Sequence, residues 1–120
     1  MTALIRRNFE DPHETRPFEG GTGMLQVLET EHGIVGRATF EPGWRWSEHL
    51  KPIAATDSCQ AAHTCHFVSG RMKVVMDDGE AIEYGPGEDA IMAPGHDAWI
   101  VSDEPCVIVD RHGFANDARR

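Results

Sequence analysis

Residues 57–70 of this sequence concentrate side chains that can bind metals or move protons. They supply one carboxylate, two thiols and two imidazoles: Asp57, Cys59, His63, Cys65 and His66. Cysteine, histidine and carboxylate together suit Zn²⁺, Fe²⁺ or Ni²⁺ better than Ca²⁺ or Mg²⁺, which prefer oxygen ligands. Because the stretch closes with Val68-Ser69-Gly70, we expect a strand here that runs into a tight turn.

The spacing of these residues selects among them. Side chains alternate between the two faces of a strand, so Asp57, Cys59 and His63 share one face if the segment is extended, whereas His66 lies on the other. Three protein ligands would leave an open position for substrate or water. The plainer alternatives are that Cys59 is a buried apolar residue and His63 a satisfied core histidine. Asp57 is a weaker ligand candidate because Asp also caps turns.

A second cluster of candidate residues follows the Pro-Gly pair at positions 42–43. Trp44, Trp46 and Glu48 share one strand face, and His49 adjoins them. If that face points inward, two indoles would line a small-molecule pocket, and the indole surface would disfavour the charged form of Glu48, which suits a general acid or base. The alternative is that both tryptophans are core residues and Glu48 faces solvent.

The rest of the chain consists of short β-rich runs with few helix signals. The runs lie at 24–28, 34–40, 71–76, 81–84, 90–93, 98–102 and 106–110. Asp78-Gly79 is a strong tight-turn signal. Many short strands spaced near ten residues apart, without helices between them, predict an all-β antiparallel barrel or sandwich. Residues 10–23 are rich in Pro, Gly and charge, so we expect residues 1–23 to form an irregular N-terminal arm. The long connection at 47–58 is expected to serve function.

Composition limits the class of protein. With 120 residues, the chain is expected to form one domain, residues 1–120, with its own core. A net charge of −9 argues against nucleic acid and against anionic membranes. No segment is apolar enough for a signal peptide or a membrane span. An odd number of cysteines without framework spacing favours a reducing compartment, so we expect a cytoplasmic protein.

The chain resembles the small single-domain cupins, whose first motif is G-x5-H-x-H-x3–4-E-x6-G. Counting back from Gly70 places His63 in the glutamate position of that motif. Cys59 and Asp57 then stand in the positions of the second and first histidine. Every ligand type is thus changed, so the resemblance transfers ligand positions and not ligand residues.

The second cupin motif, G-x5-P-x-G-x2-H-x3-N, is matched by Gly87 and Gly95, with Ala93 in the proline position. Its histidine position holds Ala98, but His96 lies two residues earlier on the same strand face. This spacing suggests a shifted ligand. The sequence also resembles an uncharacterised cupin subgroup with Pro-Gly-Trp-x-Trp-Ser-Glu (42–48) and Pro-Gly-His-Asp-Ala-Trp (94–99). Trp99 closes the latter motif, as a core residue or at the pocket edge.

The resemblance covers residues 33–110 and implies a jelly-roll barrel that pairs as a homodimer through edge strands. It implies a metal-binding protein, with Zn, Fe or Ni held by Cys59, His63 and His96 and with Asp57 as a fourth candidate. Acting on a small organic molecule, such an enzyme could use Glu48 as acid or base. Redox chemistry with O₂, isomerisation and hydrolysis all stay open. The alternatives are a non-catalytic cupin that senses a small molecule, and metal-free acid–base catalysis by His63.

Overall fold

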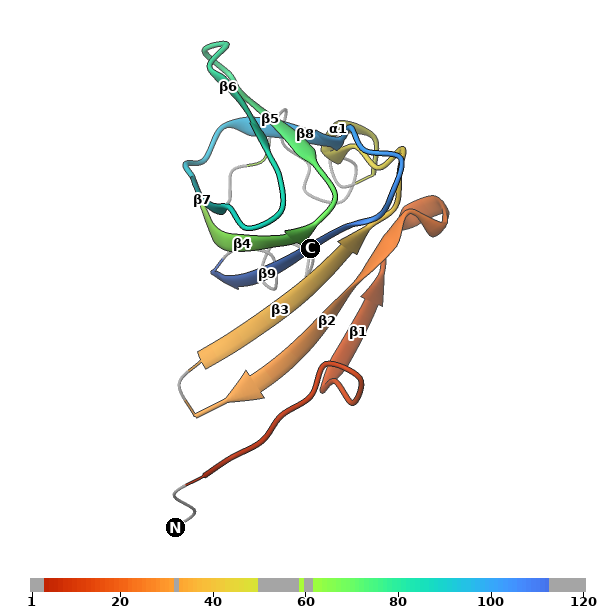
Figure 1. The fold of residues 1–120 in the computed structure, drawn as a ribbon, viewed down its shortest axis with the longest axis vertical. Coiled ribbons are helices and arrows are strands. Elements are labelled where there is room, and N and C mark those ends of the chain that lie inside the picture. Colours follow the sequence, from red (N-terminus) through yellow and green to blue (C-terminus); the bar gives the residue numbers. More distant parts are fainter. Residues whose placement is uncertain (1–3, 32, 50–58, 60–61, 113–120) are drawn as a thin grey trace.

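The computed structural model describes residues 4–31, 33–49, 59 and 62–112, and this part of the chain is almost entirely β-strand (Figure 1). The strands are β1 (Glu14–Pro17), β2 (Gly23–Thr30), β3 (Gly33–Phe40), β4 (His63–Ser69), β5 (Met72–Met76), β6 (Ala81–Tyr84), β7 (Asp89–Met92), β8 (His96–Ile100) and β9 (Cys106–His112). A 3-10 turn, η1 (Glu19–Gly21), and one short helix, α1 (Trp46–His49), complete the described elements. None of the described helices is long and apolar enough to cross a bilayer.

The strands form two antiparallel sheets that curl around a common interior. The larger sheet has the order β1-β2-β3-β9-β4-β7 and the smaller one β6-β5-β8. Figure 1 shows the barrel at one end of the molecule, while β1, β2 and part of β3 extend away from it toward the N-terminus. The all-β jelly-roll fold predicted from the strand pattern and from the cupin resemblance is confirmed.

Alternation along the strands separates the core from the surface. In β4, His63, Cys65 and Phe67 are buried, whereas Thr64, His66 and Val68 are exposed. Burial of large apolar side chains from both sheets, among them Phe67 of the larger sheet and Met72 of the smaller one, supplies the main favourable free energy of folding. His63 therefore enters the interior as part of a core-facing row.

Gly70 ends β4 at a point where only glycine fits. Its φ is +72°, and a Cβ there would lie 2.5 Å from Cα of Cys106 and 2.6 Å from the carbonyl oxygen of Pro105. The left-handed backbone and the close approach of β9 both exclude a side chain. This turn holds β4 against β9 and so fixes the row that begins at His63.

The N-terminal arm contains a strand where the sequence predicted irregular structure. Residues 14–17 pair antiparallel with residues 24–27, which places β1 at the edge of the large sheet. Pro17 occupies the last position of this edge strand, where a missing N–H is tolerated.

Residues 44–46 run beside β8 and bring both tryptophans of the second cluster to the barrel. Arg45 forms an isolated antiparallel bridge with Trp99, and the amide of Ile100 donates to the carbonyl of Trp44 at 3.1 Å. Trp44 and Trp46 flank Arg45, so both indoles point the other way, into the core, where both are buried.

Candidate metal centre

Three side chains converge in the barrel interior: Cys59, His63 and His96. Their ligand atoms all lie within 4.8 Å of one another. The Sγ of Cys59 is 3.5 Å from Nε2 of His63, and the two imidazole rings meet edge to face with centroids 5.4 Å apart. All three residues are buried, with exposed fractions of 1% for Cys59 and 3% for each histidine. They are three of the four residues that the sequence and its cupin resemblance proposed as ligands; the fourth, Asp57, lies outside the described residues.

Backbone pairing fixes the position of each ligand. The amide of Cys59 donates to the carbonyl of His96 at 2.7 Å, and the amide of Gly95 donates to the carbonyl of Cys59 at 2.7 Å. His96 begins β8, while His63 begins β4 and pairs with Met92 of β7. The first and second motifs are thus joined directly at the site, although they are more than thirty residues apart in sequence.

Each imidazole is oriented through its Nδ1 atom. Nδ1 of His63 lies 3.2 Å from Oδ2 of Asp110, and Nδ1 of His96 donates to the carbonyl of Ala93 at 2.8 Å. A carbonyl or an ionised carboxylate only accepts, so Nδ1 carries the proton in both rings. In the neutral form of each ring, the lone pair then resides on Nε2. Histidines that bind metals are held in this way by a second hydrogen bond.

Asp110 is a site residue that the sequence reasoning missed. Its side chain is buried in β9 beside His63. A signal was present, because Asp110 ends the apolar run that begins at Cys106 and shares strand parity with Cys106 and Ile108. A carboxylate on the inward face of a core strand requires a buried partner, since such groups are rarely buried unpaired.

The ligands surround a cavity of about 10 Å³. That is roughly the space that one water molecule occupies, and it is also the scale of a single ion. Trp44 and Trp46 line this cavity with two methionines and one alanine: Met72, Met92 and Ala98. Within the described part of the chain, neither indole N–H has a hydrogen-bond partner. Apart from the three candidate ligands, the lining consists of tryptophan, methionine and alanine side chains.

Other predicted site residues lie away from this cavity or outside the described residues. Trp99 is half-buried on the opposite face of β8, beneath the guanidinium of Arg45 at 4.3 Å, and the described cavity wall does not include it. The side chains of Glu48 and His49, and all of Asp57, lie outside the described residues. His66 is exposed and pairs with Asp89 at 2.6 Å on the outer surface, as its strand parity predicted.

The remaining thiols differ from Cys59 in their surroundings. Burial, followed by the charge of Asp110, raises the pKa of Cys65 to about 12, and burial alone raises the pKa of Cys106 to about 12. Both thiols therefore stay protonated at neutral pH. Cys59 is the buried cysteine that faces two imidazoles.

The donor set fits a transition metal. One sulfur and two imidazole nitrogens are the ligands that Zn²⁺, Fe²⁺ and Ni²⁺ accept, and hard cations such as Mg²⁺ would find no carboxylate among these three. Nε2 of His63 already faces the sulfur of Cys59.

Comparisons with known proteins agree with the fold. Residues 52–108 match the family of EutQ-like cupin domains. No curated protein matches the sequence significantly. An uncharacterized conserved protein with a double-stranded β-helix domain from Klebsiella pneumoniae is 25% identical, with a TM-score of 0.54, over 83% of this chain and 84% of that one.

Two further solved structures share the architecture at lower identity. An RmlC-like cupin from Shewanella frigidimarina has a TM-score of 0.55 and 18% identity over 83% of this chain and 82% of that one. The polyketide cyclase RemF from Streptomyces resistomycificus has a TM-score of 0.62 and 16% identity, covering 92% and 79%. The double-stranded β-helix defines the class of fold. The chain has the fold of the small cupins.

Proposed function

We propose that this cupin is a metal-dependent enzyme that acts on a small organic molecule at Cys59, His63 and His96. The observation that carries the proposal is the convergence of three ligand atoms within 4.8 Å, with both imidazoles held at Nδ1. A Zn, Fe or Ni ion held by three protein ligands would polarise a substrate oxygen or activate a water at its open position. The fold shared with a polyketide cyclase supports an enzymatic role.

The chain's own residues have distinct tasks in this proposal. Asp110 keeps the proton of His63 on Nδ1, and the carbonyl of Ala93 does the same for His96. Trp44 and Trp46 exclude water from the cavity, which strengthens electrostatic interactions inside it. We retain Glu48 as the acid or base, Asp57 as a fourth ligand and His49 as a pocket residue, because all three lie in sequence between Trp46 and Cys59, two residues that line the cavity.

One observation also favours a metal-free alternative. Cys59, His63 and Asp110 form a continuous chain of thiol, imidazole and carboxylate, at 3.5 Å and 3.2 Å. The same order of nucleophile, base and orienting group activates cysteines in enzymes without metals. In this alternative His63 would take the proton of Cys59 or of the substrate.

Elemental analysis of protein purified without chelators separates the two proposals. The metal proposal expects about one equivalent of Zn, Fe or Ni, and less than about a tenth of an equivalent would overturn it. A parallel preparation of His66→Ala, which removes an imidazole on the outer face, should retain the metal. Catalytic turnover that persists in fully metal-free protein would instead support the thiol–imidazole alternative.

We also propose that the chain forms a homodimer and that it lies in the cytoplasm. Strand β1 has an edge that no other described strand pairs with, and such edges favour homodimers. All three cysteines are free and buried, which supports placement in the reducing cytoplasm. Light scattering on the purified chain tests the dimer, and a monomeric mass would overturn it.

A further inference from the structure

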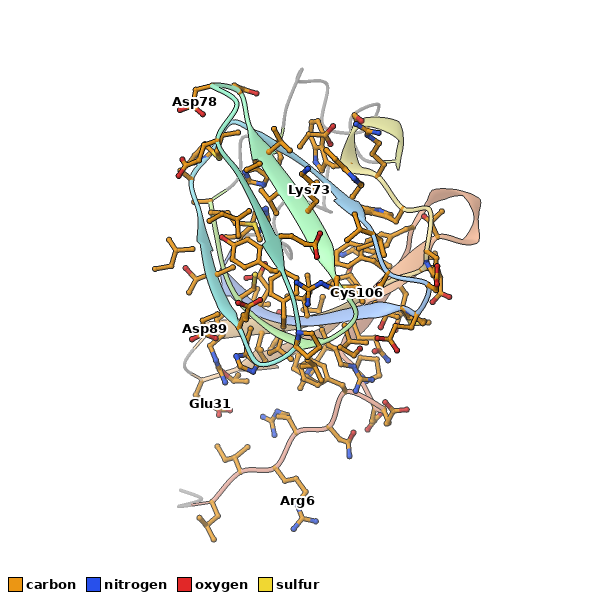
Figure 2. All side chains as sticks on the ribbon, turned by 45° about the horizontal axis from the view of Figure 1, so that its top comes forward. Arg6, Glu31, Lys73, Asp78, Asp89 and Cys106 are labelled. Atoms are coloured by element: carbon orange, nitrogen blue, oxygen red, sulfur yellow. The ribbon has the colours of Figure 1, made fainter. Side chains whose placement is uncertain are left out.

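A second and larger cavity opens on the side of the barrel, between β6 and β7. Its volume is about 160 Å³, and apolar residues from three strands line most of it, among them Val74, Ile82, Tyr84, Ile91 and Met92. Each of the two bounding strands is the last of its sheet, so the barrel is open along this seam. In Figure 2 the seam lies between the hairpin that carries Asp78 at its tip and β7, which begins at Asp89.

Strand register places the β6 side of the groove on the interior face of its sheet, while Ile91 of β7, which pairs with the exposed Thr64, lies on the outer face. Ile82 pairs with Val74, and Tyr84 pairs with Met72, so both β6 residues share the face of buried core residues. Ile82 is nevertheless 49% exposed, because none of the described strands covers it. An inward-facing isoleucine left half in water marks a place where an apolar ligand would gain by burial.

The groove and the candidate metal centre share a wall. Met92 lines both cavities, and it pairs across the strands with His63. The next residue, Ala93, lines the groove, and its carbonyl accepts the hydrogen bond from His96. Methionine has three rotatable bonds and adapts its shape, so a change of rotamer at Met92 would connect the two spaces.

We infer that this groove receives the substrate, an uncharged small molecule with an apolar ring of about benzene size, and that Met92 is the movable wall toward Cys59. The size follows from the volume, since apolar cavities of about 150 Å³ hold benzene. The apolar walls disfavour a charged ligand of either sign, and the acidic Glu80 at the lining, together with the net charge of −9, disfavours an anion in particular. The inference rests on the proposed function for the chemistry that follows binding, but the binding itself does not require a metal.

Binding is tested with phenol as the probe and benzoate as its anionic counterpart. In amide-resolved NMR titrations, phenol should shift resonances of β5, β6 and β7, while benzoate should not. Ile82→Asp should weaken phenol binding by about tenfold or more, because a carboxylate then occupies the apolar wall. Val68→Asp is the matched control, since Val68 is 52% exposed on the outer face of β4. Equal effects of the two variants, or no shifts with phenol, would overturn the inference.

The shared wall is tested by the alkylation of Cys59 with iodoacetamide in metal-free protein, followed by mass spectrometry. Phenol should slow this reaction in the wild type, and Met92→Ala should accelerate it by about tenfold because the obstructing side chain is removed. Cys106 is fully buried elsewhere and reports any general loosening. If Met92→Ala speeds the alkylation of Cys59 and Cys106 equally, the variant has loosened the whole fold, and the test is then the wild type. There, phenol should slow the alkylation of Cys59, and no slowing would refute the shared wall.

These outcomes are separate from those of the proposed function. If the protein binds phenol but contains no metal, the groove inference stands and the proposed metal centre is rejected. If the protein contains metal but does not bind phenol, the metal centre stands and the groove inference is rejected. If Ile82→Asp instead splits a dimer and phenol has no effect, the groove is an interface between copies of the chain.

Discussion

Nδ1 of His63 and Oδ2 of Asp110 lie 3.2 Å apart in the barrel core, with both side chains withdrawn from solvent. The two residues are 47 positions apart, on the adjacent strands β4 and β9. This contact fixes the proton of His63 on Nδ1 and directs Nε2 toward Cys59. The orientation of the His63 ring in the site depends on this contact.

Asp110→Asn should weaken metal binding by about 10- to 100-fold, the usual effect of removing a residue that orients a metal-binding histidine. The amide has nearly the same shape but no charge, and it holds the ring less firmly. Affinity is measured by competition with a chromogenic chelator. Asp89→Asn is the control, because Asp89 contacts the exposed His66. Equal affinities for the two variants would show that Asp110 only fills space.

Each of Cys59→Ala, His63→Ala and His96→Ala should lose the bound metal, because two remaining ligands do not hold a divalent ion firmly. His66→Ala should keep it. The loss should also remove the stabilisation that metal gives, which grows with the logarithm of the metal concentration over the dissociation constant. Thermal melting with and without added Zn²⁺ measures this. A His63→Ala protein that retains stoichiometric metal would show that the central ligand is misassigned.

The buried thiol of Cys106 should make the fold sensitive to alkali. Burial raises its pKa from the ordinary 9.0 to about 12, so the folded state holds the proton more tightly than the unfolded chain. Its contribution to stability is complete below pH 9 and is lost progressively as the pH rises from 9 toward 12. Urea unfolding at pH 8 and pH 10.5 should show this decline, and Cys106→Ala should reduce it. If the free energy of unfolding falls by the same amount between these pH values in Cys106→Ala, the decline does not come from Cys106.

Gly70→Ala should destabilise the fold more than Gly79→Ala does. Both glycines have positive φ, +72° and +96°, so both substitutions carry a backbone cost of about 1 kcal/mol. At Gly70 the new Cβ would also meet the backbone of β9 at 2.5 Å, whereas nothing lies within 4 Å at Gly79. Urea midpoints of the two variants measure the difference. Similar midpoints would mean that β9 moves aside easily.

The sequence predicted the barrel well because its signals are local. Alternation in β4 and the Asp78-Gly79 turn are set by neighbours in the chain, and they need no knowledge of distant contacts. Strand β1 was not predicted, because its composition, rich in Pro and charge, is typical of loops. Its pairing with β2 supplies the hydrogen bonds that its own sequence does not indicate.

The site residues that local spacing could predict also differ from those that depend on contacts between distant segments. Spacing within each motif proposed Cys59, His63 and His96, and strand parity correctly kept His66 on the outer face. The partner of His63 could not be found from spacing, because Asp110 reaches it only through the pairing of β4 with β9. Trp99 was ambiguous for a related reason. Its face is set by the bridge to Arg45, a contact between distant segments.

The most direct test of the metal centre is anomalous diffraction from crystals of the protein purified without chelators. Data collected on both sides of the absorption edges of Zn, Fe and Ni identify the element and its position. We predict one strong anomalous peak between Sγ of Cys59, Nε2 of His63 and Nε2 of His96, at bonding distances of about 2.0–2.3 Å. A well-ordered barrel with no anomalous peak among these three atoms, even after soaking with Zn²⁺, would contradict this prediction.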